Sequence, residues 1–206
     1  MPTRPRAAAP ARNAAGAARM RIIAGRHRGR VLAAPEGLTV RPTADRARQA
    51  VFDMLAHGPE TAGRLLAEAT VLDAFAGTGA MGIEALSRGA ARAWFIEKDP
   101  VAFAAIRANL GRIGEIARAK VIRADALAPP AAEVPVTLAF LDPPYGQHLC
   151  APALEALAAK NWFAEDAVVV VEHAADDPVA PPPAFHPFDA RRHGRAHFLL
   201  LRYRRS

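Results

Sequence analysis

One glycine turn constrains the fold of this chain more than any other stretch. The apolar run 71–75 precedes the turn and has the length of a buried strand. Gly77 and Gly79 permit positive φ angles and a close approach of a ligand to the backbone. Residues 80–86 are good helix formers, and Gly89 can end the helix. A helix that begins at such a turn directs free N–H groups and a positive dipole end toward the turn. The stretch therefore predicts a strand–turn–helix unit with a bound ligand.

The residues around this turn leave two cofactors open. The spacing Gly77-x-Gly79-x-x-Gly82 matches the dinucleotide-binding fingerprint. Glu97 ends the next expected strand, where that fingerprint places an acceptor for ribose hydroxyls. Asp73 favours S-adenosylmethionine, because a carboxylate before the turn would repel a pyrophosphate but could accept a hydrogen bond from the ammonium of a methionine moiety.

Strand and helix patterns alternate along the chain after the turn. The expected strands are 93–97, 120–123, 136–141 and 167–172, and the expected helices are 100–110 and 151–159. This alternation predicts an α/β fold, a Rossmann-like parallel sheet with helices on both faces. Residues 184–186 and 197–203 are two further candidate strands, joined by the segment 189–194. We expect them to form a terminal antiparallel hairpin at one edge of the sheet.

The chain before the turn divides into parts of different character. Residues 1–19 are rich in alanine, arginine and proline, and we expect a disordered extension. Residues 20–40 contain a short candidate hairpin, and the α/β domain is expected over 41–206. Thr43 is a plausible N-cap of a helix that ends at Gly58.

Positive charge gathers at both ends of the chain. The net charge is +7, and no acidic residue precedes Glu36. Basic residues recur on the expected hairpin, whose strands would be 21–24 and 30–33, and in the last expected hairpin. Two basic ends around a neutral middle favour a nucleic-acid partner. The candidate RNA contacts are Arg21, Arg26, His27, Arg28, Arg30, Arg191 and Arg192.

Composition excludes several other classes of protein. The single cysteine, Cys150, excludes an internal disulfide framework and fits a reducing compartment, so we expect a cytoplasmic protein. No Cys/His cluster has the spacing of a metal site, and no metal is expected. No apolar run approaches membrane-spanning length, so no membrane partner is expected.

Acidic residues follow the expected parallel strands, at the edge where open sheets bind ligands. Asp73 lies at the glycine turn, and Glu97 can accept hydrogen bonds from two ribose hydroxyls. Asp125, which precedes Ala126, can accept from an adenine amino group. Asp142 lies opposite, where a reacting group would sit.

The motif Asp142-Pro143-Pro144-Tyr145 indicates the chemistry. Two prolines without N–H groups end strand pairing and make a rigid loop with outward carbonyls. A carboxylate and a nearby carbonyl can hold both N–H bonds of an exocyclic amine on a planar base, which frees the nitrogen lone pair to attack an electrophile. Tyr145 can stack on the base. Transfer of a methyl group then depends on alignment and electrostatics.

These residues carry a resemblance to a known family. Asp73-x-Phe75-x-Gly77-x-Gly79 with Asp142-Pro-Pro-Tyr145 resembles amino-methyltransferases that use S-adenosylmethionine. Met20-Arg-Ile-Ile-Ala-Gly-Arg26, Arg41-Pro-Thr-Ala-Asp-Arg46 and Leu86-Ser-Arg-Gly-Ala-Ala91 narrow it to the bacterial 16S ribosomal RNA guanine-N2 methyltransferases, and within them to the guanine 966 enzymes.

The resemblance implies a seven-stranded methyltransferase fold and S-adenosylmethionine as cofactor. It also implies that the protein is a monomer whose partner is 16S ribosomal RNA or the assembling 30S subunit. The implied catalytic residues are Asp142, Pro143, Pro144 and Tyr145. The candidate cofactor residues are Asp73, Phe75, Gly77, Gly79, Glu97, Asp125, Ala126, Arg41 and Thr43. Residues 1–19 depart from the family pattern.

Three other functions remain open on the residues alone. A DNA amino-methyltransferase shares the Asp-Pro-Pro-Tyr motif, although no insertion here is long enough for a target-recognition region. A dinucleotide-dependent oxidoreductase would leave that motif unexplained. A ribosome-binding protein that has lost catalysis is disfavoured by the intact motifs.

Overall fold

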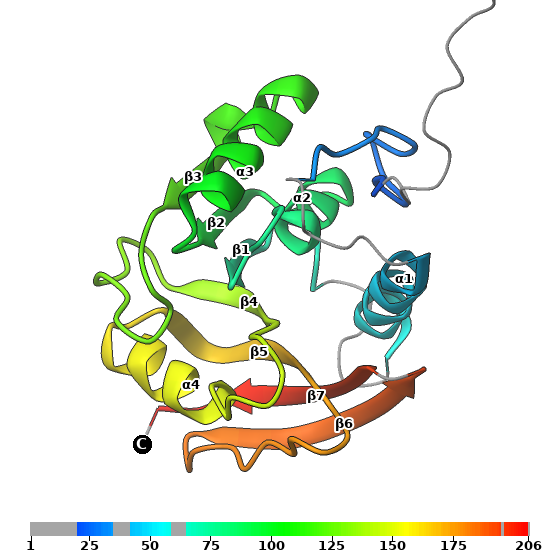
Figure 1. Ribbon diagram of the computed structural model, residues 1–206. Helices are drawn as coiled ribbons and strands as arrows, with labels where there is room; N and C mark the ends of the chain where they lie inside the picture. The colour runs from blue at the N-terminus through cyan, green and yellow to red at the C-terminus, as the bar shows by residue number, and fades with distance from the viewer. Residues whose placement is uncertain (1–19, 35–41, 59–64, 195, 206) are drawn as a thin grey trace, which may run out of the picture.

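The computed structural model describes residues 20–34, 42–58, 65–194 and 196–205 (Figure 1). A seven-stranded sheet with the order β3-β2-β1-β4-β5-β7-β6 forms its centre. The strands are β1 (Thr70–Ala74), β2 (Arg92–Ile96), β3 (Ala119–Ile122), β4 (Val136–Leu141), β5 (Phe163–His173), β6 (Phe185–His193) and β7 (Ala196–Tyr203). The first five are parallel, and β7 runs antiparallel to both β5 and β6. The predicted α/β sheet with a terminal antiparallel hairpin is confirmed.

Helices cover both faces of the sheet. Side chains alternate along each strand, and apolar side chains on both faces are buried in two separate cores. The helices are α1 (Pro42–His57), α2 (Ala80–Ser87), α3 (Pro100–Ile113) and α4 (Cys150–Ala159), with a short 3-10 helix η1 (Ile116–Arg118). Val71 of β1 faces the core shared with α1, α2 and α3. Its neighbour Leu72 faces the second core, which contains α4 and the buried Trp162. Of the helices in the described ranges, none is both long and apolar enough to span a membrane.

Two predictions about the ends of elements are wrong. Helix α1 begins at Pro42, so Thr43 lies inside the helix rather than at its N-cap. Proline favours this position because its fixed φ suits the first helical turn. The segment 189–194 is not a loop, since β6 continues to His193 and pairs with β7. Arginines fit there because an edge strand can keep polar side chains in solvent.

The N-terminal segment, residues 20–34, is docked onto the α/β domain. The expected hairpin is reduced to one antiparallel bridge between Arg21 and Val31. Both oxygens of the buried Glu84 carboxylate on α2 accept backbone N–H groups of the segment, at 2.8 and 3.0 Å. Gly25 packs so tightly on α2 that a Cβ there would lie 1.9 Å from the carbonyl oxygen of Ser87. The segment is therefore held in a fixed place relative to the glycine turn.

Candidate active site and nucleic-acid surface

The glycine turn between β1 and α2 adopts left-handed backbone angles, as the sequence predicts. Gly77 and Gly79 have φ angles of 54° and 78°. A Cβ on Gly77 would meet no atom within 4 Å, so space for a ligand lies over it. A Cβ on Gly82 would instead lie 2.4 Å from the Phe95 ring, so this glycine serves the packing of α2 on β2. Phe75 also has a positive φ, 62°, a strained conformation that clusters at functional sites.

Asp73 joins the end of β1 to the first turn of α2. Its Oδ2 accepts a hydrogen bond from the Gly82 N–H at 2.9 Å, and only 4% of the residue is exposed. Burial raises the pKa of Asp73 to about 7, partly opposed by the Gly82 N–H. A cation placed beside this carboxyl would restore its ionised form.

Glu97, immediately after β2, closes the other side of the turn. Its Oε2 accepts the Gly77 N–H at 2.7 Å, and its Oε1 accepts the Asp99 N–H at 2.8 Å. Each carboxylate oxygen has a second lone pair for a further donor. Glu97 can therefore hold the glycine turn and accept from ribose hydroxyls at once. Asp99 itself caps α3 by accepting from Val101 and Ala102, a role that the sequence analysis did not assign.

Asp125 lies beyond the end of β3, on the same edge of the sheet. Its Oδ1 accepts the Leu127 N–H at 3.0 Å, and Lys98 lies 3.4 Å from its Oδ2. The side chain is 38% exposed, so a donor can reach it from solvent. Its neighbour Ala126 is buried in the second core.

The Asp-Pro-Pro-Tyr loop leaves the sheet between the ends of β1 and β5. Leu141, the last residue of β4, pairs with Ala74 on one side and Val171 on the other. As a residue Asp142 is exposed, although neighbouring protein atoms partly desolvate its carboxyl. This desolvation, and then the charges of Glu172 and Asp73, raise the pKa of Asp142 well above its ordinary value. The four predicted acids thus lie along one edge of the sheet.

Tyr145 follows Asp142 by three residues in the same loop and is exposed. The residue is 48% exposed, and its hydroxyl donates to Glu172 Oε1 at 2.5 Å. In the loop, Pro143 is buried and Pro144 is exposed. Sequence reasoning did not assign Glu172, although it follows the valines of β5 as the other acids follow their strands. An accessible ring beside two carboxyl groups suits a planar base with donor groups.

A second acid that the sequence analysis missed holds the loop after the motif. Asp177 Oδ2 accepts the Gly146 N–H at 2.9 Å, and Asp177 Oδ1 lies 2.5 Å from His148 Nδ1. Asp177 is buried and lies in the connection after β5. Asp177 therefore holds the end of the Asp-Pro-Pro-Tyr loop against the connection after β5, and no local sequence pattern signals this contact.

Two predicted cofactor residues cannot be placed. Arg41 lies outside the described residues, as does the side chain of Thr43. The nearby Arg48 is buried, where it donates to the Arg21 carbonyl at 2.7 Å and to Asp45 at 2.9 Å. Arg48 thus links α1 to the N-terminal segment.

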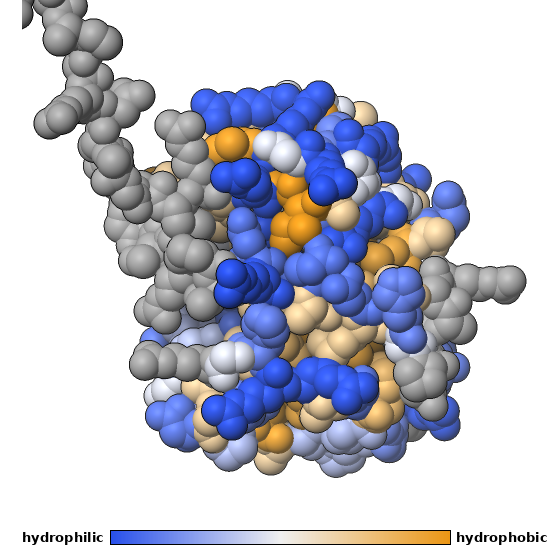
Figure 2. All heavy atoms as spheres, turned by 90° about the vertical axis from the view of Figure 1, so that its right-hand side faces the viewer, coloured by the Kyte–Doolittle hydropathy of each residue, from blue (hydrophilic) through white to orange (hydrophobic). Residues whose placement is uncertain are grey.

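The predicted basic residues are exposed with one exception. On the N-terminal segment the exposed arginines are Arg21, Arg26, Arg28 and Arg30, and on β6 they are Arg191 and Arg192. His27, expected at the surface, is buried, and its Nε2 lies 2.5 Å from Glu115 Oε1. On the face shown in Figure 2, hydrophilic residues lie above and below a more hydrophobic area in the middle. His27 is therefore an anchor of the segment, while the arginines around it face solvent.

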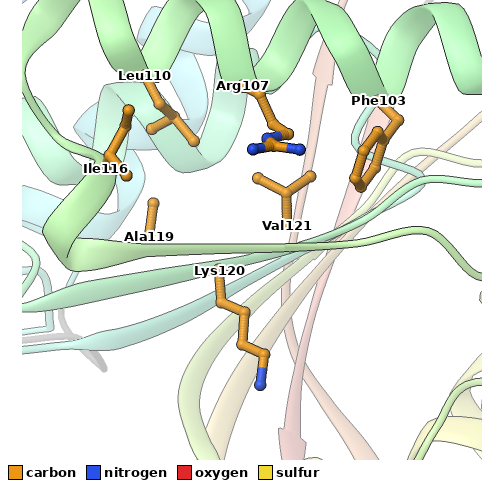
Figure 3. A pocket seen from close by; sticks show the side chains of 7 residues that line it. All are labelled: Phe103, Arg107, Leu110, Ile116, Ala119, Lys120 and Val121. Carbon is orange, nitrogen blue, oxygen red and sulfur yellow. The ribbon is translucent and has the colours of Figure 1, made fainter.

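A separate cavity of about 280 Å³ lies between α3 and β3. Its lining residues are Phe103, Arg107, Leu110, Ile116, Ala119, Lys120 and Val121. In Figure 3 the guanidinium of Arg107 lies over Val121, while Lys120 points to the opposite side of β3. None of these residues belongs to the predicted cofactor or catalytic set, so this cavity is not the candidate active site.

Comparison with known proteins agrees with this geometry. Ribosomal RNA small subunit methyltransferase D of Escherichia coli K12 is 35% identical over 84% of this chain and 83% of its own length. The protein of that name from Haemophilus influenzae is 34% identical over 79% of this chain and 83% of its own length. The solved structure of yhhF from Escherichia coli has a TM-score of 0.77 and 30% identity, and covers 92% of this chain and 100% of that chain. The resemblance and the seven-stranded methyltransferase fold expected from the sequence are confirmed. A family model matches residues 20–202, and the chain therefore belongs to the family described as conserved hypothetical protein 95.

Proposed function

We propose that this protein transfers a methyl group from S-adenosylmethionine to the exocyclic N2 amine of a guanine in 16S ribosomal RNA, at guanine 966, during assembly of the small subunit. The observation that carries the proposal is the position of the Asp142-to-Tyr145 loop beside the glycine turn, with an accessible carboxyl and an accessible ring. The names of the relatives, rRNA small subunit methyltransferases, support the polymer class.

The residues around the glycine turn fit S-adenosylmethionine. The open space over Gly77 accommodates a ligand close to the backbone. Asp73 would accept from its ammonium group and Glu97 from its ribose hydroxyls, while Asp125 would accept from the adenine amino group. When bound, the cofactor supplies an electrophilic methyl group on a sulfonium centre.

The Asp142 loop prepares the nucleophile. Asp142 and an adjacent backbone carbonyl accept the two N–H bonds of the guanine amine, which takes the nitrogen lone pair out of conjugation with the ring. Tyr145 stacks on the base, and the target guanine must be unpaired or flipped out of a helix. After transfer, the amine proton goes to Asp142 or to water. The protein contributes alignment and preorganised charge, which account for most catalysis of this kind.

The exposed arginines supply affinity for the RNA backbone. Arg26 and Arg28 project from the docked N-terminal segment, and Arg191 and Arg192 project from β6. Phosphate contacts of this kind position a polymer without selecting its sequence. Residues 20–40 thus act as an RNA-contacting part, and residues 41–206 as the catalytic part.

The proposal is tested with small subunits from a strain that lacks this protein. The purified protein and labelled S-adenosylmethionine should introduce N2-methylguanosine into 16S rRNA, identified by nucleoside digestion and mass spectrometry. Methyladenosine or methylcytidine would indicate a different base, and transfer to DNA alone would indicate the DNA enzyme. A rise in melting temperature with NAD but not with S-adenosylmethionine would favour the oxidoreductase, because a ligand that binds only the folded state stabilises it.

A further inference from the structure

We propose that Glu172 determines the choice of base, by accepting the N1–H of the target guanine. This inference rests on the proposed function and adds to it a residue for selecting guanine over adenine and cytosine. Asp142 then holds the reacting amine, and Glu172 holds the neighbouring donor on the same edge of the base.

Strand register brings the two carboxylates together. Leu141, the last residue of β4, pairs with Val171 on β5, so Asp142, directly after β4, and Glu172, on β5, each follow one member of this pair. Neighbouring strands lie about 4.8 Å apart, so the two residues start from adjacent positions. After desolvation, the charge of Glu172 also raises the pKa of Asp142, in agreement with this proximity.

Both carboxylates retain acceptor capacity. Within the described part of the chain, no residue donates a hydrogen bond to Asp142. Glu172 receives the Tyr145 hydroxyl on Oε1, while Oε2 receives no hydrogen bond from a described residue. Desolvation by burial raises the pKa of Glu172 as well, and the hydrogen bond from the Tyr145 hydroxyl opposes this rise. The two carboxyl groups together receive one hydrogen bond from a described residue, that of the Tyr145 hydroxyl. Their remaining acceptor capacity favours a ligand edge that is rich in N–H groups.

The Watson–Crick edge of guanine supplies those groups. Guanine places N1–H directly beside its N2 amine, so two neighbouring carboxylates can receive donors from both positions. Adenine and cytosine carry a bare ring nitrogen next to their amine, and that lone pair would face the Glu172 carboxylate. An acceptor facing an acceptor in a partly desolvated site leaves both groups unpaired. The arrangement therefore favours guanine by a matched donor and disfavours the other two bases by repulsion.

Tyr145 couples this recognition to stacking. Its hydroxyl fixes one oxygen of Glu172, at 2.5 Å, while its exposed ring is the proposed platform for the base. The second oxygen of Glu172 is then held at a defined place relative to a stacked base. A base that stacks on the ring but has no N1–H would place a lone pair, instead of a donor, against the Glu172 carboxylate.

The test uses small subunits reconstituted around semisynthetic 16S rRNA that carries either guanine or 2-aminopurine at the target position. 2-Aminopurine keeps the exocyclic amine but has no N1–H. Single-turnover methylation by the wild-type protein should be about 10- to 100-fold faster on guanine, the range expected for one hydrogen bond to a charged group. In Glu172→Gln the side-chain amide can donate to the bare N1, so the preference for guanine should fall to within a few-fold, through slower transfer to guanine and faster transfer to 2-aminopurine.

Two controls separate base selection from folding. Glu155→Gln changes an exposed carboxylate on α4 and should keep the full preference for guanine. Glu172→Gln should keep the wild-type melting temperature and affinity for S-adenosylmethionine, because Glu172 contacts neither the glycine turn nor Glu97 in this structure.

The outcomes distinguish this inference from the proposed function. Equal rates of wild-type transfer to guanine and 2-aminopurine, or an unchanged preference in Glu172→Gln, would overturn the role of Glu172 while leaving guanine methylation intact. Absence of wild-type transfer to guanine would overturn the proposed function and this inference together.

Discussion

Binding of S-adenosylmethionine should release a proton from Asp73. Burial raises the pKa of this carboxyl to about 7 in the ligand-free protein, so it is largely protonated below that pH. An ammonium group beside it would favour the carboxylate and lower its pKa again. The affinity should therefore rise by up to about tenfold per pH unit well below pH 7, and at pH 5 it should be about 50-fold weaker than at pH 7, where half of the carboxyl is ionised.

On the basic side of this pH profile, the affinity depends on the titration of the ligand's own ammonium group. An α-amino group titrates at about 7.7–8.0 at a peptide N-terminus and at higher pH in a free amino acid, so the affinity should fall again on the basic side of the profile. A maximum above about pH 7 is therefore expected. The same carboxyl holds its proton more tightly in the folded protein than in the unfolded chain. Its contribution to stability is thus present below about pH 4 and is lost as the pH rises through about 7.

Titration calorimetry at pH 6, in two buffers with different ionisation enthalpies, measures the number of protons released. Wild-type protein should release close to one proton per cofactor bound. Asp73→Asn should release none and should lose the acidic side of the affinity profile, whereas the exposed control Asp176→Asn should behave as wild type. An affinity that does not change between pH 5 and pH 7, or uptake of a proton on binding, would refute this reasoning.

Three further predictions concern the glycine turn, the exposed arginines and the docked N-terminal segment. Glu97→Ala should weaken binding of S-adenosylmethionine by about 1.5–3 kcal/mol, because charged acceptors for the ribose and the turn are lost; unchanged affinity in calorimetry would contradict its role. Replacing Arg26 and Arg28 by alanine should flatten the log–log salt dependence of RNA binding by about 0.7 per lost phosphate contact, without changing cofactor affinity; an unchanged slope would mean that these arginines do not contact RNA. Gly25→Ala should destabilise the protein in urea denaturation by more than about 2 kcal/mol, since the new Cβ would clash with α2, whereas Gly29→Ala has open space and should cost about 1–2 kcal/mol from its positive φ alone; equal losses would contradict the tight docking.

Local patterns predicted the parts of the site that depend on chain order. The glycines of the turn required positive φ angles, and the acids after the parallel strands meet because those strands end at one edge of the sheet. Asp73, Glu97 and Asp142 were predicted in this way. Glu172 follows the same rule, but no glycine turn or proline motif directly follows it in the sequence, so no local pattern marked it as a site residue.

Tertiary partners account for what the sequence could not predict. His27 resembles a surface residue within its arginine-rich turn, and only the folded chain places it against Glu115 from the region between α3 and β3. Asp177 likewise holds Gly146 from a loop that is remote in sequence. The arginines of β6 suggested a loop because a strand at the sheet edge needs little apolar pattern to form its hydrogen bonds.

The central claim is that Asp142 holds and activates the amine that receives the methyl group. It is tested most directly by single-turnover methylation of small subunits with Asp142→Ala, together with the affinity of the variant for S-adenosylmethionine. We expect nearly normal cofactor affinity, because Asp73, Glu97 and Asp125 remain, and transfer slower by about a hundredfold or more, as when one preorganised contact to a reacting group is lost. Transfer by Asp142→Ala at close to the wild-type rate would contradict this account of the reaction.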